Sequence, residues 1–151
     1  MIPITGFTHL ATGALAWMIL YRTGADVSVA AATIIGSLLP DIDHPGSKLG
    51  RRVPVISHIM YLFGHRGVTH SLLFVLILAA AGHFVWLPAY GLALGAAVHI
   101  AADMLTPSGV PLFWPHGRRY SLFGFRTGGI ADRLLGIAAS AMTVLFALAK
   151  G

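Results

Sequence analysis

The chain has 151 residues, a net charge of +5 and no cysteine. Only 10% of its residues are charged, against roughly 25% in ordinary soluble domains, and the mean hydropathy is +0.79. These values favour a single polytopic membrane domain over residues 1–151 rather than a soluble bundle. They exclude disulfides and any cysteine-based zinc site.

Five apolar stretches separated by turn signals predict the secondary structure. They cover about 7–21, 27–39, 71–87, 89–105 and 130–149, and their wealth of Ala, Leu, Ile and Met favours helices over strands. Several are shorter than the roughly 20 residues that cross a ~30 Å hydrocarbon core. Because they are apolar on all sides, we expect an all-α bundle of about five short transmembrane helices.

Two long connections join these stretches. Residues 45–64 contain a weakly apolar patch at 53–63, which indicates a short interfacial helix. Residues 109–129 interleave aromatic residues with arginines, a pattern typical of the headgroup level of a membrane.

Basic residues predict the orientation of the chain. With five spans in alternation, the N-terminus and both long connections lie on one side, and the positive-inside rule makes that side cytoplasmic. Topology thus accounts for the positive charge, and no nucleic-acid partner is expected. No Lys or Arg precedes Arg22, so the start lacks the positive region of a cleaved signal peptide and we expect it to be retained. The basic residues on the cytoplasmic side are Lys48, Arg51, Arg52, Arg66, Arg118, Arg119 and Arg126.

The second stretch ends at Pro40, which is followed by Asp41, Asp43 and His44. Two carboxylates this close repel each other unless they are protonated or neutralised by a cation, so a divalent metal ion is the leading interpretation. The alternative is a solvated acidic loop, although Asp is unfavourable beside the C-terminal end of a helix.

His65 and His70 lie on either side of a turn before the third stretch, which Thr69 or Ser71 is placed to cap. One helix face does not hold both imidazoles, but a loop that enters a helix brings them together. Arg66 between them supplies a cation suited to a phosphate or carboxylate. The alternative is a basic loop in contact with headgroups.

His99 and Asp103 are four residues apart in the fourth stretch and therefore share one helix face. Gly91 and Gly95 continue this stripe and predict the close approach of a neighbouring helix. The stripe therefore points inward and ends in two candidate ligands. A polar pair between helices is the alternative.

His9 lies near the start of the first stretch, on the same side as the three clusters, and is either a ligand or a hydrogen-bonded histidine at the interface. His83, within the third stretch, is expected to form a hydrogen bond between helices. Nitrogen and oxygen donors without thiolate favour zinc, manganese, iron or nickel over calcium, and such centres hydrolyse phosphoryl or acyl substrates. The candidate metal ligands are His9, Asp41, Asp43, His65, His70, His99 and Asp103, with His44 as a further donor.

The order of these motifs resembles a known family. An early His is followed by Gly-Ser-Leu-Leu-Pro-Asp-Ile-Asp-His at 36–44, His-Arg-Gly-Val-Thr-His-Ser at 65–71, His-Ile-Ala-Ala-Asp-Met-Leu-Thr-Pro-Ser-Gly-Val at 99–110 and Trp114-Pro115. Over nearly the whole chain this pattern is similar to the YdjM-like family of bacterial and archaeal membrane-bound metal-dependent hydrolases. The resemblance implies an integral inner-membrane protein with hydrolase activity.

More remotely, the ligand order is similar to that of the zinc-dependent phospholipase C and P1 nuclease superfamily. This likeness implies His9, Asp41, His65 or His70, His99 and Asp103 as ligands. The chain departs from that superfamily because it has no Glu and no clear second His-x-x-x-Glu/Asp pair. Two Zn²⁺ ions, or Mn²⁺ in their place, are therefore expected rather than three.

The expected function is metal-dependent hydrolysis of a phosphoester in a lipid or another amphiphile. Arg66, Arg118 and Arg119 are the candidates for binding the phosphate, and Asp43 or His44 for proton transfer. A divalent metal-ion transporter or channel is the main alternative, because intramembrane His and Asp can line an ion pathway. A heme-binding subunit is another, since paired His can serve as axial ligands.

Overall fold

The computed structural model describes residues 6–47, 49–62, 66–126 and 128–149, and in these ranges the regular structure is helical. An isolated antiparallel bridge joins Val110 to Tyr120, and no strand is present in the described ranges. The all-α prediction is therefore confirmed. The elements are α1 (Gly6–Arg22), α2 (Val27–Gly36), η1 (Leu39–Asp43), α3 (Pro54–Leu62), η2 (Val68–His70), α4 (Leu72–Phe84), α5 (Ala89–Met104) and α6 (Ile130–Leu148), where η denotes a 3-10 helix.

Helix boundaries follow local signals in the sequence. The Asp26 side chain accepts a hydrogen bond from the Ser28 amide and caps the start of α2. Ser71 caps α4 in the same way through the Phe74 amide. Because Pro40 cannot continue an α-helix, the chain tightens after Gly36 into η1.

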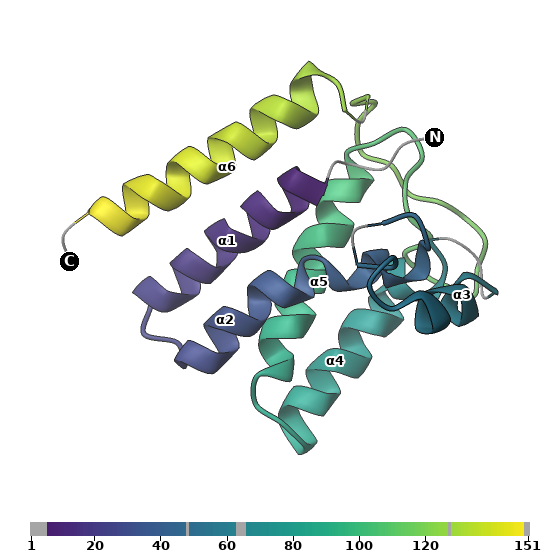
Figure 1. Cartoon of the computed structure of the whole chain (residues 1–151), viewed down its shortest axis with the longest axis horizontal. Helices are drawn as coiled ribbons and strands as arrows, with labels where there is room; N and C mark the ends of the chain where they lie inside the picture. Colours follow the sequence, from purple (N-terminus) through teal and green to yellow (C-terminus); the bar gives the residue numbers. More distant parts are fainter. Residues whose placement is uncertain (1–5, 48, 63–65, 127, 150–151) are drawn as a thin grey trace.

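Helix α5 occupies the centre of the fold. It packs against α1, α2 and α4, while α6 packs on the outer side of α1 (Figure 1). The short helix α3 lies against η1, at the end of the bundle where the long connections gather (Figure 1). This end therefore brings together segments that are far apart in the sequence.

The contact between α5 and α2 is a contact between backbones. A Cβ atom at Gly95 would lie 2.5 Å from the Ser37 amide nitrogen, and one at Gly91 would overlap the Val29 carbonyl. On the opposite helix, a Cβ at Gly36 would lie 2.7 Å from the Leu92 Cα. The predicted close approach at the small-residue stripe of α5 is thus confirmed.

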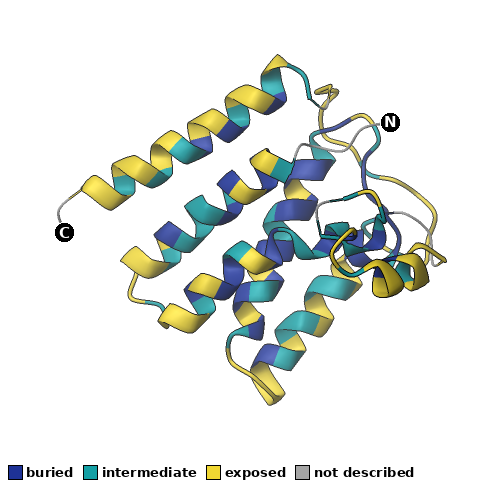
Figure 2. Ribbon diagram, viewed as in Figure 1, coloured by how far each residue is buried: buried dark blue, intermediate teal, exposed yellow. Residues whose placement is uncertain are grey.

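Small and polar residues make up most of the interior, whereas many large apolar side chains lie outside. The largest fully buried side chains include His9, His70 and His99. In contrast, Leu62 and Val85 are each 83% exposed, and Figure 2 shows that α3 and α6 are exposed over most of their length. An extended apolar exterior of this kind marks a surface that contacts lipid or a partner rather than water.

Membrane crossing is supported by one helix. Of the described helices, only α6, with 19 residues, combines the length and apolar composition needed to cross a bilayer. Helices α2, α4 and α5 are apolar but shorter, and α5, with 16 residues, measures about 24 Å at ~1.5 Å per residue. The expected bundle of about five spans is therefore not confirmed.

Replacing Gly95 with Ala should weaken the α2–α5 contact, because the added methyl would push apart two backbones. We expect a loss of about 1–3 kcal/mol, typical of overpacking, seen as a lower apparent Tm of the purified protein in detergent. Gly124→Ala is the matched control, since a Cβ there meets nothing within 4 Å. Equal Tm values for the two variants would show that the α2–α5 contact does not depend on Gly95.

Candidate metal centre

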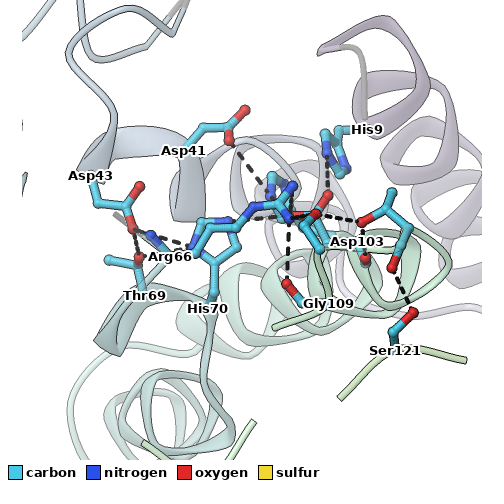
Figure 3. A network of polar contacts seen from close by, with 12 residues as sticks. His9, Asp41, Asp43, Arg66, Thr69, His70, Asp103, Gly109 and Ser121 are labelled. Carbon is cyan, nitrogen blue, oxygen red and sulfur yellow. Dashed lines mark hydrogen bonds and ion pairs between the residues drawn. The ribbon is translucent and has the colours of Figure 1, made fainter. Parts of the chain in front are cut away.

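Four helical elements bring the chemistry-bearing residues to one end of the bundle. The first turn of α1, the 3-10 helices η1 and η2, and the last turns of α5 all meet there (Figure 3). The residues that they contribute are His9 from α1, Asp41 and Asp43 from η1, His70 from η2, and His99 and Asp103 from α5.

Asp103 is the point on which the other groups converge. Its Oδ1 lies 3.5 Å from His9 Nε2, and its Oδ2 lies 3.5 Å from His70 Nε2 and 3.8 Å from His99 Nε2. The same Oδ2 forms an ion pair of 2.8 Å with the Arg66 guanidinium. The side chains of these five residues are at most 4% exposed.

The ring of His99 is fixed from both sides. Its Nδ1 donates a hydrogen bond of 2.7 Å to the Ser37 carbonyl, so Nε2 is the nitrogen that offers a lone pair to the cluster. The His9 ring stacks on it with centroids 3.6 Å apart and planes inclined by 9°. Asp41 Oδ1 lies 3.7 Å from the same Nε2.

These residues fit a divalent cation. Within the described part of the chain, Nε2 of His9, Nε2 of His99 and Oδ1 of Asp103 are buried without a hydrogen-bond partner. His9 Nε2 lies 3.5 Å from Asp103 Oδ1, and His99 Nε2 lies 3.8 Å from Asp103 Oδ2 and 3.7 Å from Asp41 Oδ1. These distances are longer than ordinary hydrogen bonds, but they approach the roughly 3.3–3.5 Å between ligands of a tetrahedral ion with bonds of about 2.0–2.1 Å. Two triads have all donor atoms within 4.8 Å of one another, namely His9, His99 and Asp103, and Asp41, His70 and His99.

Asp43 lies behind His70 rather than in either triad. Its Oδ2 accepts hydrogen bonds from the Arg66 amide at 3.0 Å and from the Thr69 hydroxyl at 2.5 Å, and it lies 3.3 Å from His70 Nδ1. A carboxylate in this position orients the imidazole and raises the basicity of its other nitrogen. The structure thus places this predicted ligand and proton carrier in a supporting position.

Arg66 enters the cluster from the loop before η2. Its φ of 54° lies in the left-handed region that few non-glycine residues adopt, which marks a backbone held by its surroundings. The guanidinium donates to Ser108 Oγ at 2.6 Å and to the Gly109 carbonyl at 3.4 Å, in addition to its ion pair with Asp103. It is therefore a fixed part of the site rather than a surface cation.

The two other predicted phosphate-binding arginines lie outside the cluster. Arg119 is exposed, but its Nη1 reaches the Gly109 carbonyl at 3.3 Å, the same carbonyl that Arg66 contacts. Arg118 instead lies over the Tyr120 ring, with its guanidinium 5.4 Å from the ring centre. Arg119 thus borders the site, while Arg118 does not.

Asp41 forms the open edge of the site. Its side chain is 15% exposed, whereas those of His9, His99 and Asp103 are fully buried. Burial raises the pKa of the Asp41 carboxyl, an effect that a bound cation would counteract.

His44, the residue after η1, is half-buried with its ring against Gly46 and belongs to neither triad. The predicted ligand His65 lies outside the described residues.

Several supporting contacts were not anticipated from the sequence. Of the two residues expected as the cap of the third stretch, Ser71 is the cap, and Thr69 donates a hydrogen bond to Asp43. Asp132 in the first turn of α6 is buried and accepts hydrogen bonds from the Thr8 hydroxyl at 2.6 Å and from the Gly128 amide at 2.8 Å. The hydrogen bond between Thr8 and Asp132 joins α6 to α1, one residue before His9. The only signal in the sequence was an acidic residue at the start of an apolar stretch.

The geometry defines an all-helical protein with a buried His/Asp cluster that fits a metal ion at one end of the bundle. The chain belongs to the YdjM inner membrane protein family, whose sequence profile matches residues 4–150. Membership of this family supports a membrane location.

Relatives of the chain occur in several bacteria. It is 50% identical over 103 residues to the inner membrane protein YdjM of Escherichia coli (strain K12) and, to the same degree, to that of Shigella flexneri. This match covers 62% of the chain and 53%, or about half, of the length of each relative. The chain is also 37% identical over 140 residues to the Uncharacterized protein YvsG of Bacillus subtilis (strain 168), covering 87% of both chains. No solved structure matches it.

Replacing Asp43 with Asn should reduce the affinity for Zn²⁺ about 10–100-fold without changing the number of ions bound, because the carboxylate supports His70 from behind. Isothermal titration of the purified protein measures both quantities. Asp26→Asn is the matched control, since Asp26 caps the distant start of α2 and Asn retains that cap. An unchanged affinity in the Asp43 variant would remove Asp43 from the centre.

Chelation should destabilise the protein. A cation at 100 times its dissociation constant contributes about 2.7 kcal/mol to the folded state, so EDTA should lower the apparent Tm. In His99→Ala the Tm should be insensitive to EDTA, because that variant lacks the nitrogen shared by both triads. His83→Ala, with its ring against Tyr90, is the control and should respond like the wild type.

Proposed function

We propose that the chain is a polytopic inner-membrane hydrolase that uses divalent metal ions to cleave a phosphoester in a lipid or another amphiphile. The observation that carries the proposal is the buried convergence of His9, His99 and Asp103, whose facing atoms have no hydrogen-bond partner among the described residues, with Asp41 beside them. Such groups are costly to bury unless a cation satisfies them.

In the proposed arrangement, α1, α2, α4 and α5 accompany α6 in the membrane. Their short lengths require tilting or a locally thinned bilayer, and their exposed apolar side chains would then face lipid. The connections at the centre's end carry exposed arginines, among them Arg51, Arg52 and Arg126. By the positive-inside rule, this end faces the cytoplasm.

Divalent ions at the cluster would supply a Lewis acid and activate water. The protein's own groups supply the rest. His9, His70, His99, Asp41 and Asp103 would hold the metal, with Asp41 at the edge from which a substrate would approach.

Charged groups around the centre have distinct proposed roles. Arg119, exposed at the border of the site, is placed to bind an incoming phosphate. Arg66 offsets the negative charge of Asp103 from within. His44, three residues after Asp41, would exchange protons with solvent at its ring nitrogen, while Asp43 keeps His70 in place.

Apolar surfaces at the same end support an amphiphilic substrate. The segment after α5 exposes Phe123 and Phe125, whose rings stack 5.5 Å apart, and α3 exposes Val55 and Leu62. An acyl or isoprenyl tail would contact such surfaces while its phosphate reaches the arginines.

The alternative functions fit the geometry less well. A transport pathway would need donors distributed through the depth of the bundle, but the candidate donors gather at one end. His83 lies in the last turn of α4, where its Nδ1 is 3.2 Å from the Tyr90 hydroxyl of α5, as expected for a hydrogen bond between helices. Heme ligation is disfavoured because His9 and His99 stack directly on each other and leave no space for a porphyrin between them.

The proposal predicts that the purified protein contains a divalent metal and hydrolyses one or more substrates in a panel of phospholipids and isoprenyl phosphates. Asp103→Asn should lower kcat at least about 100-fold, because it removes the central carboxylate, whereas Asp26→Asn should retain full activity. Metal content is measured by mass spectrometry and hydrolysis by phosphate release. Equal hydrolysis by the Asp103 and Asp26 variants would reject the site, and metal-free protein with full activity would reject the mechanism.

A further inference from the structure

We propose that Arg66 takes the place of a second divalent cation, so that the centre holds one metal ion per chain. The inference rests on the proposed metal site and concerns how many ions its residues admit. It departs from the two ions expected from the sequence because of three features of the structure.

The first feature is that the two donor triads compete for one atom. Both contain His99, and His99 offers only Nε2, because its Nδ1 is committed to the Ser37 carbonyl. A single imidazole nitrogen has one lone pair and binds one ion. The triads therefore cannot both be filled with His99 as a ligand, and a second ion beside Asp41 and His70 would need the Oδ2 of Asp103 in its place.

The second feature is the arrangement of the Asp103 carboxylate. A carboxylate that holds two ions side by side commonly gives one oxygen to each, but Oδ2 is paired with the Arg66 guanidinium at 2.8 Å. Among the residues that the structure describes, Oδ1, which faces His9 Nε2 at 3.5 Å, has neither a hydrogen-bond partner nor a contact with Arg66. Arg66 cannot readily withdraw, since Ser108 and Gly109 hold its guanidinium and Asp43 holds its backbone amide.

The third feature is the balance of charge. Among the described residues, the centre contains three carboxylates, on Asp41, Asp43 and Asp103, and one guanidinium, on Arg66. With neutral histidines, one divalent cation makes this buried set electrically neutral. A second would leave two excess positive charges in a site from which water is largely excluded, a costly arrangement. Arg66 thus supplies the positive charge that a second ion would otherwise provide.

The test is the number of ions bound by the full chain in detergent. Wild type, Arg66→Lys, Arg66→Met and Arg119→Met are dialysed against buffered Zn²⁺, and their zinc-to-protein ratio is measured by mass spectrometry and by isothermal titration. We expect one ion in wild type, in Arg66→Lys, which keeps the charge, and in Arg119→Met, which changes only the border of the site. Arg66→Met, which frees the Asp103 oxygen and removes the charge, should bind two.

Two tightly bound ions in wild type would overturn the inference, and so would a folded Arg66→Met variant that binds only one. If Arg66→Met does not fold, as judged by circular dichroism and gel filtration, electron paramagnetic resonance of the Mn²⁺-loaded wild type decides the matter. An isolated-ion spectrum at saturation supports the inference, and a spin-coupled pair overturns it. The ion count does not depend on activity, and a separate assay of hydrolysis distinguishes this inference from the proposed function. One bound ion without hydrolysis would refute the proposed function alone, and two ions with hydrolysis would refute the inference alone.

Discussion

The backbone contact between α2 and α5 is the constraint on which the rest of the structure depends. Gly95 brings α5 against the end of α2, and Gly13 of α1 packs against the Ser37 side chain from the other direction. Three helices therefore meet around Ser37, whose carbonyl then receives the His99 imidazole. Without this close approach, η1 would not lie over the last turns of α5, and Asp41 would not reach His99.

A second constraint is the reversal of the usual distribution of polarity. The interior holds mainly alanines, glycines, hydroxyls and the charged cluster, with Met18, Ile100 and Val110 as larger apolar members, while many leucines, isoleucines and phenylalanines are exposed. Packing small residues allows helix backbones to approach closely, and the outward apolar surface suits a membrane location. The buried polar groups then need partners from one another, and Asp43, Thr69 and Asp132 provide them through short contacts between distant segments.

Arg66 shows how such a site tolerates charge. Its guanidinium lies among the groups that fit a cation, and it is held by a hydroxyl and a carbonyl from the segment after α5. The sequence suggested that this residue binds a phosphate or a carboxylate, because a guanidinium suits both groups. In the structure, Arg66 forms an ion pair with the Asp103 carboxylate. It therefore offsets part of the negative charge of the centre even without a substrate.

The sequence by itself determined the helical class, the five apolar stretches, the small-residue face of α5 and the pairing of His99 with Asp103, because these depend on composition and on the period of a helix. Only the tertiary structure decided which ring nitrogen of His99 faces the cluster, that Asp43 supports His70 from behind, and that Arg66 binds Asp103. The physical reason is that these choices depend on contacts between residues tens of positions apart, and helical periodicity carries no information about partners beyond one helix. Helix length was visible in the sequence, but how short helices sit in a bilayer depends on their packing as well as on their composition.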